Sequence, residues 1–93
     1  MNEAGQSFKT RLELIPQDPG VYLMKDTLGS VIYVGKAVNL RNRLRSYFTD
    51  NPQGSSKVIA MISHIADFET IICHTETEAL MLESTLIKRH QPL

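Results

Sequence analysis

The segments at residues 20–25 and 30–35 constrain the fold of this chain more than any other feature. They read GVYLMK and SVIYVG, are rich in β-branched and aromatic residues, and are separated by DTLG, a polar turn that ends in glycine. This pattern predicts an antiparallel β-hairpin. If the loop is Asp26–Gly29, pairing outward from it sets Tyr22 directly opposite Tyr33 on one face of the ribbon. We therefore expect the two tyrosines to be neighbours.

The rest of the chain predicts four helices and a third strand. Asn39 is a plausible N-cap for the helix after the hairpin, because its side chain can accept a hydrogen bond from a free backbone N–H. Thr75 and Glu78 fit a capping box at the start of the last helix. The expected elements are helices at 7–15, 40–48, 57–66 and 76–89, and a strand at 67–74 whose apolar centre predicts burial. The predicted fold class is α/β, with a small three-stranded, mostly antiparallel sheet flanked by helices.

The length of 93 residues predicts one domain. Two prolines and a glycine in PQDPG end the first predicted helix, so we expect an N-terminal extension at 1–13 and the domain at 14–93. The sequence shows no leader and no apolar run of membrane-spanning length, which makes a cytoplasmic protein the default expectation. Cys73 has no cysteine partner and lies between apolar neighbours, which predicts a buried thiol in a reducing compartment.

The charge of the chain is segregated, although its formal net value is zero. The basic residues gather at 27–49, and this zone is either a solvated helix face or a binding surface for phosphates. Arg43 lies at the inner edge of its predicted helix, where its guanidinium needs a partner such as a phosphate. Arg41 and Arg45 lie further round, as surface charge or as contacts to a DNA backbone. Residues 27–49 contain no acid but four basic residues: Lys36, Arg41, Arg43 and Arg45.

An acid interrupts the apolar stripe of the last predicted helix. Glu83 has Ala79, Leu80, Leu86 and Ile87 at its four neighbouring helical positions. Burying a lone carboxylate costs several kcal/mol, so Glu83 must be paired, protonated or bound to a cation. The two alternatives are a structural ion pair with a lysine or arginine, and a metal ligand that reaches a cleft.

The three tyrosines form a second candidate group. Tyr22 and Tyr33 are neighbours in the predicted hairpin, and Tyr47 shares a helix edge with Arg43. A phenol acts as a general base only if cations or hydrogen bonds lower its pKa from about 10, and Lys36 and Arg43 are placed to do this. The structural alternative is that the rings only pack, with their hydroxyls bonded to the backbone.

Spacing excludes two other kinds of site. The segment GSVIYVGKA is one residue too long between its glycines for a P-loop and has alanine where a hydroxyl is needed. His64, His74 and His90 are not spaced like zinc ligands, and one cysteine completes no such site.

Together these segments resemble the GIY-YIG nuclease domain. The resemblance rests on GVY, then after ten residues YVG and a lysine, then LRNRLRSYF and EALMLESTLIK, and it covers residues 14–93. Val21 and Val34 stand where the family name has isoleucine. Within the family, the motifs are most similar to the branch that incises DNA in bacterial nucleotide excision repair.

The resemblance implies a metal-dependent endonuclease that cuts a phosphodiester of damaged duplex DNA on the 3′ side of a lesion, in a complex with the partner protein UvrB. Tyr33 would orient or deprotonate the attacking water, Tyr22 would assist, and Lys36 would support the pKa of the base. Arg43 and Tyr47 would hold the scissile phosphate.

The resemblance also implies a single Mg²⁺ or Mn²⁺ bound by Glu83. Gly20 and Gly35 would be structural glycines of the two motifs, and Gly35 would let the strand end approach the substrate closely. The family pattern carries an asparagine after the last helix, beyond Leu93. The chain is therefore expected to be one domain of a longer protein, monomeric and weak in DNA binding by itself.

Two alternatives stay open. A non-catalytic DNA-binding or docking module would use the basic helix for phosphates and keep Glu83 in a salt bridge. Another GIY-YIG nuclease, such as a stand-alone incision enzyme of the same branch, would share the site.

Overall fold

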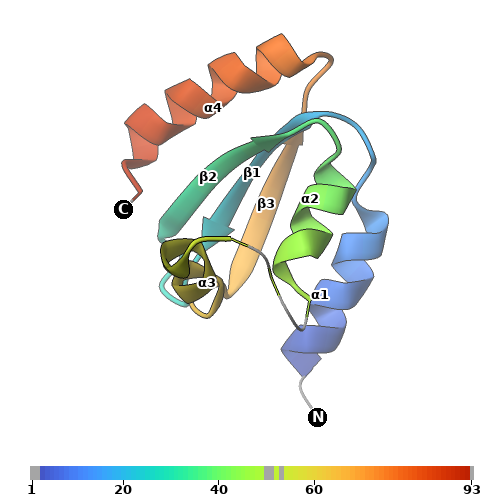
Figure 1. Cartoon of the computed structure of the whole chain (residues 1–93), viewed down its shortest axis with the longest axis vertical. Coiled ribbons are helices and arrows are strands. Elements are labelled where there is room, and N and C mark those ends of the chain that lie inside the picture. The colour runs from blue at the N-terminus through green and yellow to red at the C-terminus, as the bar shows by residue number, and fades with distance from the viewer. Residues whose placement is uncertain (1–2, 50–51, 53, 93) are drawn as a thin grey trace.

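The computed structural model describes residues 3–49, 52 and 54–92 of the chain. Every predicted element is present, and the α/β class with a three-stranded antiparallel sheet flanked by helices is confirmed (Figure 1). The elements are α1 (Glu3–Leu14), β1 (Gly20–Lys25), β2 (Val31–Ala37), α2 (Leu40–Tyr47), α3 (Ser56–Ile62), β3 (Asp67–Ile72) and α4 (Glu76–His90).

The sheet has the strand order β2-β1-β3, so β1 is central and the other two strands are edges. β1 is buried along nearly its whole length. The burial expected at the centre of the third strand is wrong, because Ile71 and Ile72 of β3 are exposed and only Phe68 is fully buried. The reason is that α4 packs on β2 and β1, which leaves this part of the edge strand uncovered.

The hairpin has a different register from the one predicted. Tyr22 pairs with Gly35, and Met24 pairs with Tyr33. Lys25 lies opposite Val31, whereas the predicted loop would pair it with Ser30, so the register is shifted by one residue at the turn. A bulge between Met24 and Lys25 shifts it by one more. Because a shift of two residues keeps every side chain on its face of the sheet, Tyr22 and Tyr33 still lie on the same face.

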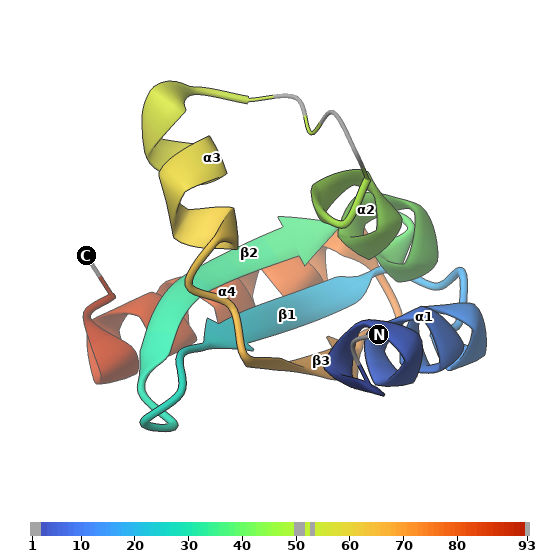
Figure 2. The same ribbon diagram turned by 90° about the horizontal axis from the view of Figure 1, so that it is seen from below.

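The alternation of side chains along β1 builds a core on each face of the sheet. Tyr22 and Met24 join the core under α1 and α2, whereas Val21 and Leu23 join the core under α4. Figure 2 shows α4 on the opposite side of the sheet from α1 and α2. α3 lies on the same side as α2, and its Val58 packs against the first core.

The predicted caps are confirmed with one change. The side chain of Asn39 accepts a hydrogen bond from the N–H of Asn42 at the start of α2, and Thr75 accepts one from the N–H of Glu78 at the start of α4. Glu78 in turn accepts a bond from the N–H of His74, one residue earlier than a capping box requires. α3 ends at Ile62, four residues before the predicted end.

The first helix belongs to the body of the protein. Leu12 and Ile15, at and after the end of α1, lie in the first core, and Arg11 forms an ion pair with Asp67 of β3 at 2.6 Å. The family-like region and this helix therefore pack as one unit, while the expected boundary at residue 14 stays a prediction. Cys73 is buried, as expected. In the part of the chain that the structure describes, no helix is both long and apolar enough to span a bilayer.

Candidate functional site

Three phenols meet on the α2 side of the sheet and form what we call the tyrosine cluster. Tyr22 comes from β1, Tyr33 from β2 and Tyr47 from the last turn of α2. The ring centroid of Tyr22 lies 6.1 Å from that of Tyr33 and 5.8 Å from that of Tyr47. The hydroxyls of Tyr22 and Tyr47 are hydrogen-bonded at 2.6 Å. Tyr22 and Tyr47 are buried whereas Tyr33 is half-buried, so Tyr33 is the phenol that a substrate can reach.

Both motif glycines are needed for close packing. A β-carbon at Gly35 would overlap the phenol end of Tyr22, which lies on the neighbouring strand. A β-carbon at Gly20 would overlap the carbonyl of Ile71 and the side chain of Leu40. Gly35 thus makes room for the cluster, and its expected role in letting a substrate approach stays a prediction.

The pKa values of the cluster do not shift as expected. Burial raises the pKa of Tyr22 far above its ordinary value, and the hydrogen bond to Tyr47 acts in the same direction. Burial, followed by the proximity of Tyr47, also raises the pKa of Tyr33. Arg43 lowers both pKa values, but its effect is smaller than that of burial. The surrounding protein groups therefore keep both phenols protonated near pH 7, and the role of a phenol as general base stays a prediction.

Lys36 and Arg43 share a hollow of about 430 Å³ at the junction of β2 and α2. Both side chains are exposed, and neither forms an ion pair with an acid in residues 3–49, 52 and 54–92. Asn39, Asn42 and Ser46 also line the hollow. Two cations and several neutral polar groups in one hollow fit an anion such as a phosphate.

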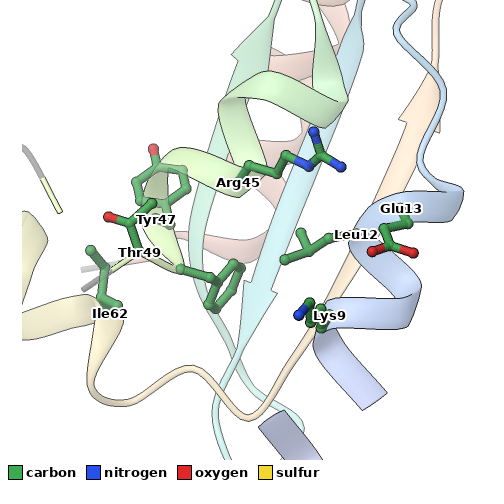
Figure 3. Close-up of a pocket in the computed structure, with 8 residues that line it drawn as sticks. Lys9, Leu12, Glu13, Arg45, Tyr47, Thr49 and Ile62 are labelled. Atoms are coloured by element: carbon green, nitrogen blue, oxygen red, sulfur yellow. The ribbon is translucent and has the colours of Figure 1, made fainter. Parts of the chain in front are cut away.

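The other two arginines of α2 lie on its opposite flank. The Nε of Arg41 donates a hydrogen bond to the carbonyl of Ile15 at 2.7 Å, and the side chain is half-buried. This bond holds Arg41 against the segment after α1, and its expected role at a DNA backbone stays a prediction. Arg45 is exposed and extends from α2 toward α1 (Figure 3).

The pocket of Figure 3 lies on this flank of α2. It has a volume of about 680 Å³, and its lining includes Leu12, Phe48 and Ile62 with Lys9 and Arg45. Tyr47 contributes its ring, while its hydroxyl bonds to Tyr22 in the cluster. The pocket therefore backs onto the tyrosine cluster without containing Tyr33, Lys36 or Arg43.

Glu83 lies on the flank of α4 and is half-buried. Two of its four helical neighbours, Ala79 and Leu86, are buried, but Leu80 is 51% exposed and Ile87 is 41% exposed. The carboxylate thus stands at the edge of the apolar stripe and not at its centre. No hydrogen bond or ion pair joins it to any residue that the structure describes, so the predicted alternative of a structural salt bridge has no partner there.

Glu83 and the tyrosine cluster approach the same strand from opposite faces. α4 packs on the edge strand β2 and on β1, across the sheet from Tyr22 (Figure 1). The structure therefore brings together Tyr22, Tyr33 and Tyr47, and Arg43, which shares a hollow with Lys36, is close enough to act on the pKa values of Tyr22 and Tyr33. Glu83 lies on α4, on the other face of the sheet, without an ion-pair partner among the described residues. The described residues contain no group of three histidine, cysteine or acidic side chains that could form a metal cage.

One basic residue near the cluster was missed by the sequence analysis. Lys57 of α3 lines a hollow of about 170 Å³ together with Tyr33, Val58 and Met61. The available signal was a lysine in the first turn of a predicted helix, where the helix dipole favours acids.

Comparison with known proteins identifies the family. The family model of the UvrC-like GIY-YIG domain matches residues 18–93. UvrABC system protein C of Desulfitobacterium hafniense is 58% identical over 84 residues, which are 90% of this chain and 14% of that protein. The protein of the same name from Gloeobacter violaceus is 52% identical over 87 residues, or 94% of this chain, and again the chain spans 14% of its length.

The fold agrees with a solved structure over nearly its whole length. The N-terminal GIY-YIG endonuclease domain of UvrC from Thermotoga maritima, bound to its catalytic magnesium, has a TM-score of 0.80 and 42% identity, covering 99% of this chain and 96% of that one. Variants of that domain with a tyrosine changed to phenylalanine, or an asparagine changed to alanine, are also bound to the catalytic divalent cation. The family resemblance and the narrower likeness to UvrC are both confirmed: this chain belongs to the UvrC-like GIY-YIG domain family.

Proposed function

We propose that this domain is a divalent-metal-dependent endonuclease that makes the 3′ incision near a lesion in bacterial nucleotide excision repair. The observation that carries the proposal is the arrangement around β2. A reachable phenol, Tyr33, belongs to a cluster of tyrosines, and Lys36 and Arg43 share a hollow nearby. Glu83 stands on the helix packed against the same strand, and none of these three charged groups has an ion-pair partner among the residues that the structure describes. The relative from Thermotoga maritima is an endonuclease domain with a catalytic magnesium, which supports the same chemistry here.

The cations would bind and polarise the scissile phosphodiester. Arg43 presents a planar guanidinium that can bind two phosphate oxygens at once, and Lys36 adds a second positive charge in the same hollow. Charge that develops on these oxygens during hydrolysis is stabilised most by donors that are already in position. Arg43 is therefore the phosphate-binding residue of the proposed mechanism, with Lys36 supporting it.

The phenols would position the attacking water. Tyr33 is half-buried with a raised pKa, so it enters the reaction as a neutral hydroxyl that orients a water by hydrogen bonding. The hydroxyls of Tyr22 and Tyr47 are hydrogen-bonded at 2.6 Å, and the rings of this pair pack against the Tyr33 ring and keep it in place. Tyr33 could accept the proton of this water only as a phenolate, so bound cations would first have to lower its pKa.

Glu83 fits a single divalent cation. A half-buried carboxylate without a partner among the described residues is a suitable ligand, and Mg²⁺ commonly takes one or two carboxylates and keeps several waters. When bound, such an ion acts as a Lewis acid for the phosphate and the departing 3′ oxygen. Because β2 is an edge strand, a group on α4 can approach the Tyr33 side around this edge, and this supports a metal site there.

The partners follow from the family. The relatives are components of the UvrABC system, and we propose damaged duplex DNA as the substrate and UvrB as the partner of the longer protein. The isolated domain is expected to be a cytoplasmic monomer. A stand-alone incision enzyme of the same branch would use the same site, and the sequence beyond Leu93 would tell the two apart.

Metal binding separates the nuclease from a non-catalytic DNA-binding module. We expect Mn²⁺ titration of the chain, followed by calorimetry, to show one site that Glu83→Gln abolishes without changing the circular dichroism spectrum. Glu76→Gln, at an exposed acid in the first turn of the same helix, is the matched control and should bind normally. Unchanged Mn²⁺ binding by Glu83→Gln would contradict the metal assignment and favour the binding module.

Incision itself tests the roles of the other residues. In the complete protein with its repair partners, Tyr33→Phe and Arg43→Ala should each slow incision of a lesion-bearing duplex by about 100- to 1,000-fold, the usual cost of a lost transition-state donor. Near-normal cutting by either variant would remove that residue from its proposed role.

A further inference from the structure

α3 brings a basic residue beside Tyr33, in a hollow separate from the one that Arg43 lines. The helix packs through Val58 and Met61 against the core that contains the tyrosine cluster. Lys57, in its first turn, lines a hollow of about 170 Å³ whose other walls are Tyr33, Val58 and Met61. The hollow is therefore part polar and part apolar, and it opens beside the one phenol of the cluster that a substrate can reach.

The position of Lys57 has no structural explanation. It is exposed, and none of the acids in the described part of the chain forms an ion pair with it. The first turn of α3 contains no acid, and a lysine there opposes the helix dipole. A charge placed against the dipole, beside Tyr33 and without an ion-pair partner in the described part of the chain, is available for an anion brought by the substrate.

The three basic groups of this region lie in two separate hollows. Lys36 follows Tyr33 by three positions on β2, so their backbones are roughly 10 Å apart along the strand and their side chains leave opposite faces of it. Arg43 shares the hollow of Lys36 at that end, and Lys57 shares the hollow of Tyr33 at the other. A nucleic-acid strand carries one phosphate per about 3.4 Å of helix axis, so neighbouring phosphates of one strand can reach both ends.

We propose that Lys57 binds a DNA backbone phosphate next to the scissile one, on the opposite side of Tyr33 from Arg43. Val58 and Met61 contact the sugar between the two phosphates. The incised strand then runs along β2 from α3 to the start of α2, with the scissile phosphate at the tyrosine cluster. This inference rests on the nuclease function proposed above and extends it to a residue and a strand path.

The salt dependence of DNA binding tests the proposal directly. Each phosphate contact contributes about 0.9 to the slope of log affinity against log salt. For the 93-residue chain and a short fluorescent duplex, with Ca²⁺ in place of Mg²⁺ to prevent cutting, Lys57→Ala should reduce this slope by about 0.9 and weaken binding about tenfold at about 50 mM salt. Lys57→Arg should restore the slope, because it keeps the charge.

The controls separate a contact from a structural effect. Lys88→Ala removes an exposed lysine from the last turn of α4 and should leave the slope unchanged. The melting temperature of Lys57→Ala should equal or slightly exceed that of the unsubstituted chain, because alanine is a better residue for the first turn of α3 than an opposing charge. Lys57→Gln gives the same test if the alanine variant proves unstable.

Incision by the complete protein gives a second readout. At saturating DNA, Lys57→Ala should slow a single turnover of lesion incision by about three- to tenfold, and added salt should slow the variant less than the unsubstituted protein. A slope and an incision rate equal to those of the unsubstituted protein would overturn the proposal for Lys57 while leaving the nuclease intact. Absence of incision by the unsubstituted protein would overturn both.

Discussion

The phenol of Tyr22 lies against the backbone of Gly35, its partner across the hairpin, so closely that a β-carbon at position 35 would overlap the hydroxyl end of the ring. Glycine at this position is therefore what allows Tyr22 to reach Tyr47 at 2.6 Å and to stand beside Tyr33. The two motifs of the hairpin depend on each other physically, because one supplies the ring and the other supplies the space.

Replacing Gly35 with alanine should disrupt the cluster. The added methyl group displaces the Tyr22 ring, and such overpacking in a core commonly costs about 1–3 kcal/mol of unfolding free energy. We expect a loss of this size in urea denaturation, together with loss of incision. Gly29→Ala is the control: Gly29 has φ of 82°, so alanine strains the turn, but its β-carbon meets nothing within 4 Å and incision should be kept. Equal activity of the two variants would contradict the role given to Gly35.

Tyr22→Phe should change stability in a pH-dependent way. Burial and the bond to Tyr47 raise the pKa of Tyr22 above its ordinary value of 10.0, so the folded chain holds this proton more tightly than the unfolded chain. The resulting stability is full below pH 10 and falls as the pH rises above that value, toward the folded pKa. We expect the variant to lose about 1 kcal/mol at neutral pH and to show a shallower decline above pH 10. Urea denaturation at several alkaline pH values measures this. If the free energy of unfolding fell equally with pH in Tyr22→Phe and in the unsubstituted chain, the assignment would be contradicted.

The hairpin illustrates what sequence could and could not predict. The alternation of apolar and aromatic residues identified both strands and placed Tyr22 and Tyr33 on one face, because that depends only on the two-residue period of a strand. The pairing itself was wrong by two positions, since the turn and the bulge at Met24 and Lys25 each added one. A bulge depends on how the strand twists and packs between the two cores, and the residue types in this segment do not predict it.

The arginines of α2 show the same limit for the site. Helical position separated Arg43 from Arg41 and Arg45, and they do lie on different flanks, but the expected exposure is wrong for two of them: Arg43 is exposed, whereas Arg41 is half-buried against the Ile15 carbonyl. Sequence could not show that the segment after α1 occupies the flank of Arg41, because that is a contact between elements far apart in the chain. The isolated Glu83 was visible as an acid among apolar residues, but its place across β2 from the tyrosines required the packing of α4.

Arg41 and Arg43 should therefore respond differently to alanine. Arg41→Ala removes the bond to the Ile15 carbonyl and should lower the free energy of unfolding by about 1 kcal/mol, with little change in incision by the folded protein. Arg43 is exposed and makes no ion pair in the described residues, so Arg43→Ala should leave stability within about 0.5 kcal/mol and abolish most activity. Denaturation and single-turnover incision on both variants check this. An Arg41→Ala protein that is stable but inactive would show that Arg41 contacts DNA.

Asp67→Asn should loosen α1 in an acid-sensitive way. Asp67 accepts a hydrogen bond from Arg11 at 2.6 Å, and the guanidinium also lies 4.3 Å from the centre of the Phe68 ring. The bond to Arg11 lowers the pKa of Asp67 below its ordinary value of 3.8. The stabilisation is therefore present above about pH 4 and lost as the pH falls through the folded pKa. Because the side chains are 40% and 50% exposed, solvent screening limits the effect to under about 1 kcal/mol.

Hydrogen exchange in α1 measures this contact locally. At pH 7, Asp67→Asn should speed amide exchange in α1 relative to the unsubstituted chain, and at a pH well below 3.8 the difference should vanish, because Asp67 is then protonated in both states of the chain. Glu69→Gln is the matched control. Glu69 lies on the same strand as Asp67, but its ion pair, at 2.6 Å, is with Lys25 of β1 and not with a residue of α1. If both variants speed exchange in α1 equally, the effect belongs to β3 as a whole and the pair of Arg11 with Asp67 does not hold the helix. If only Asp67→Asn does so, α1 is held to the sheet by this pair and by the core contacts of Leu12, and the helix is part of the folded unit that carries the tyrosine cluster.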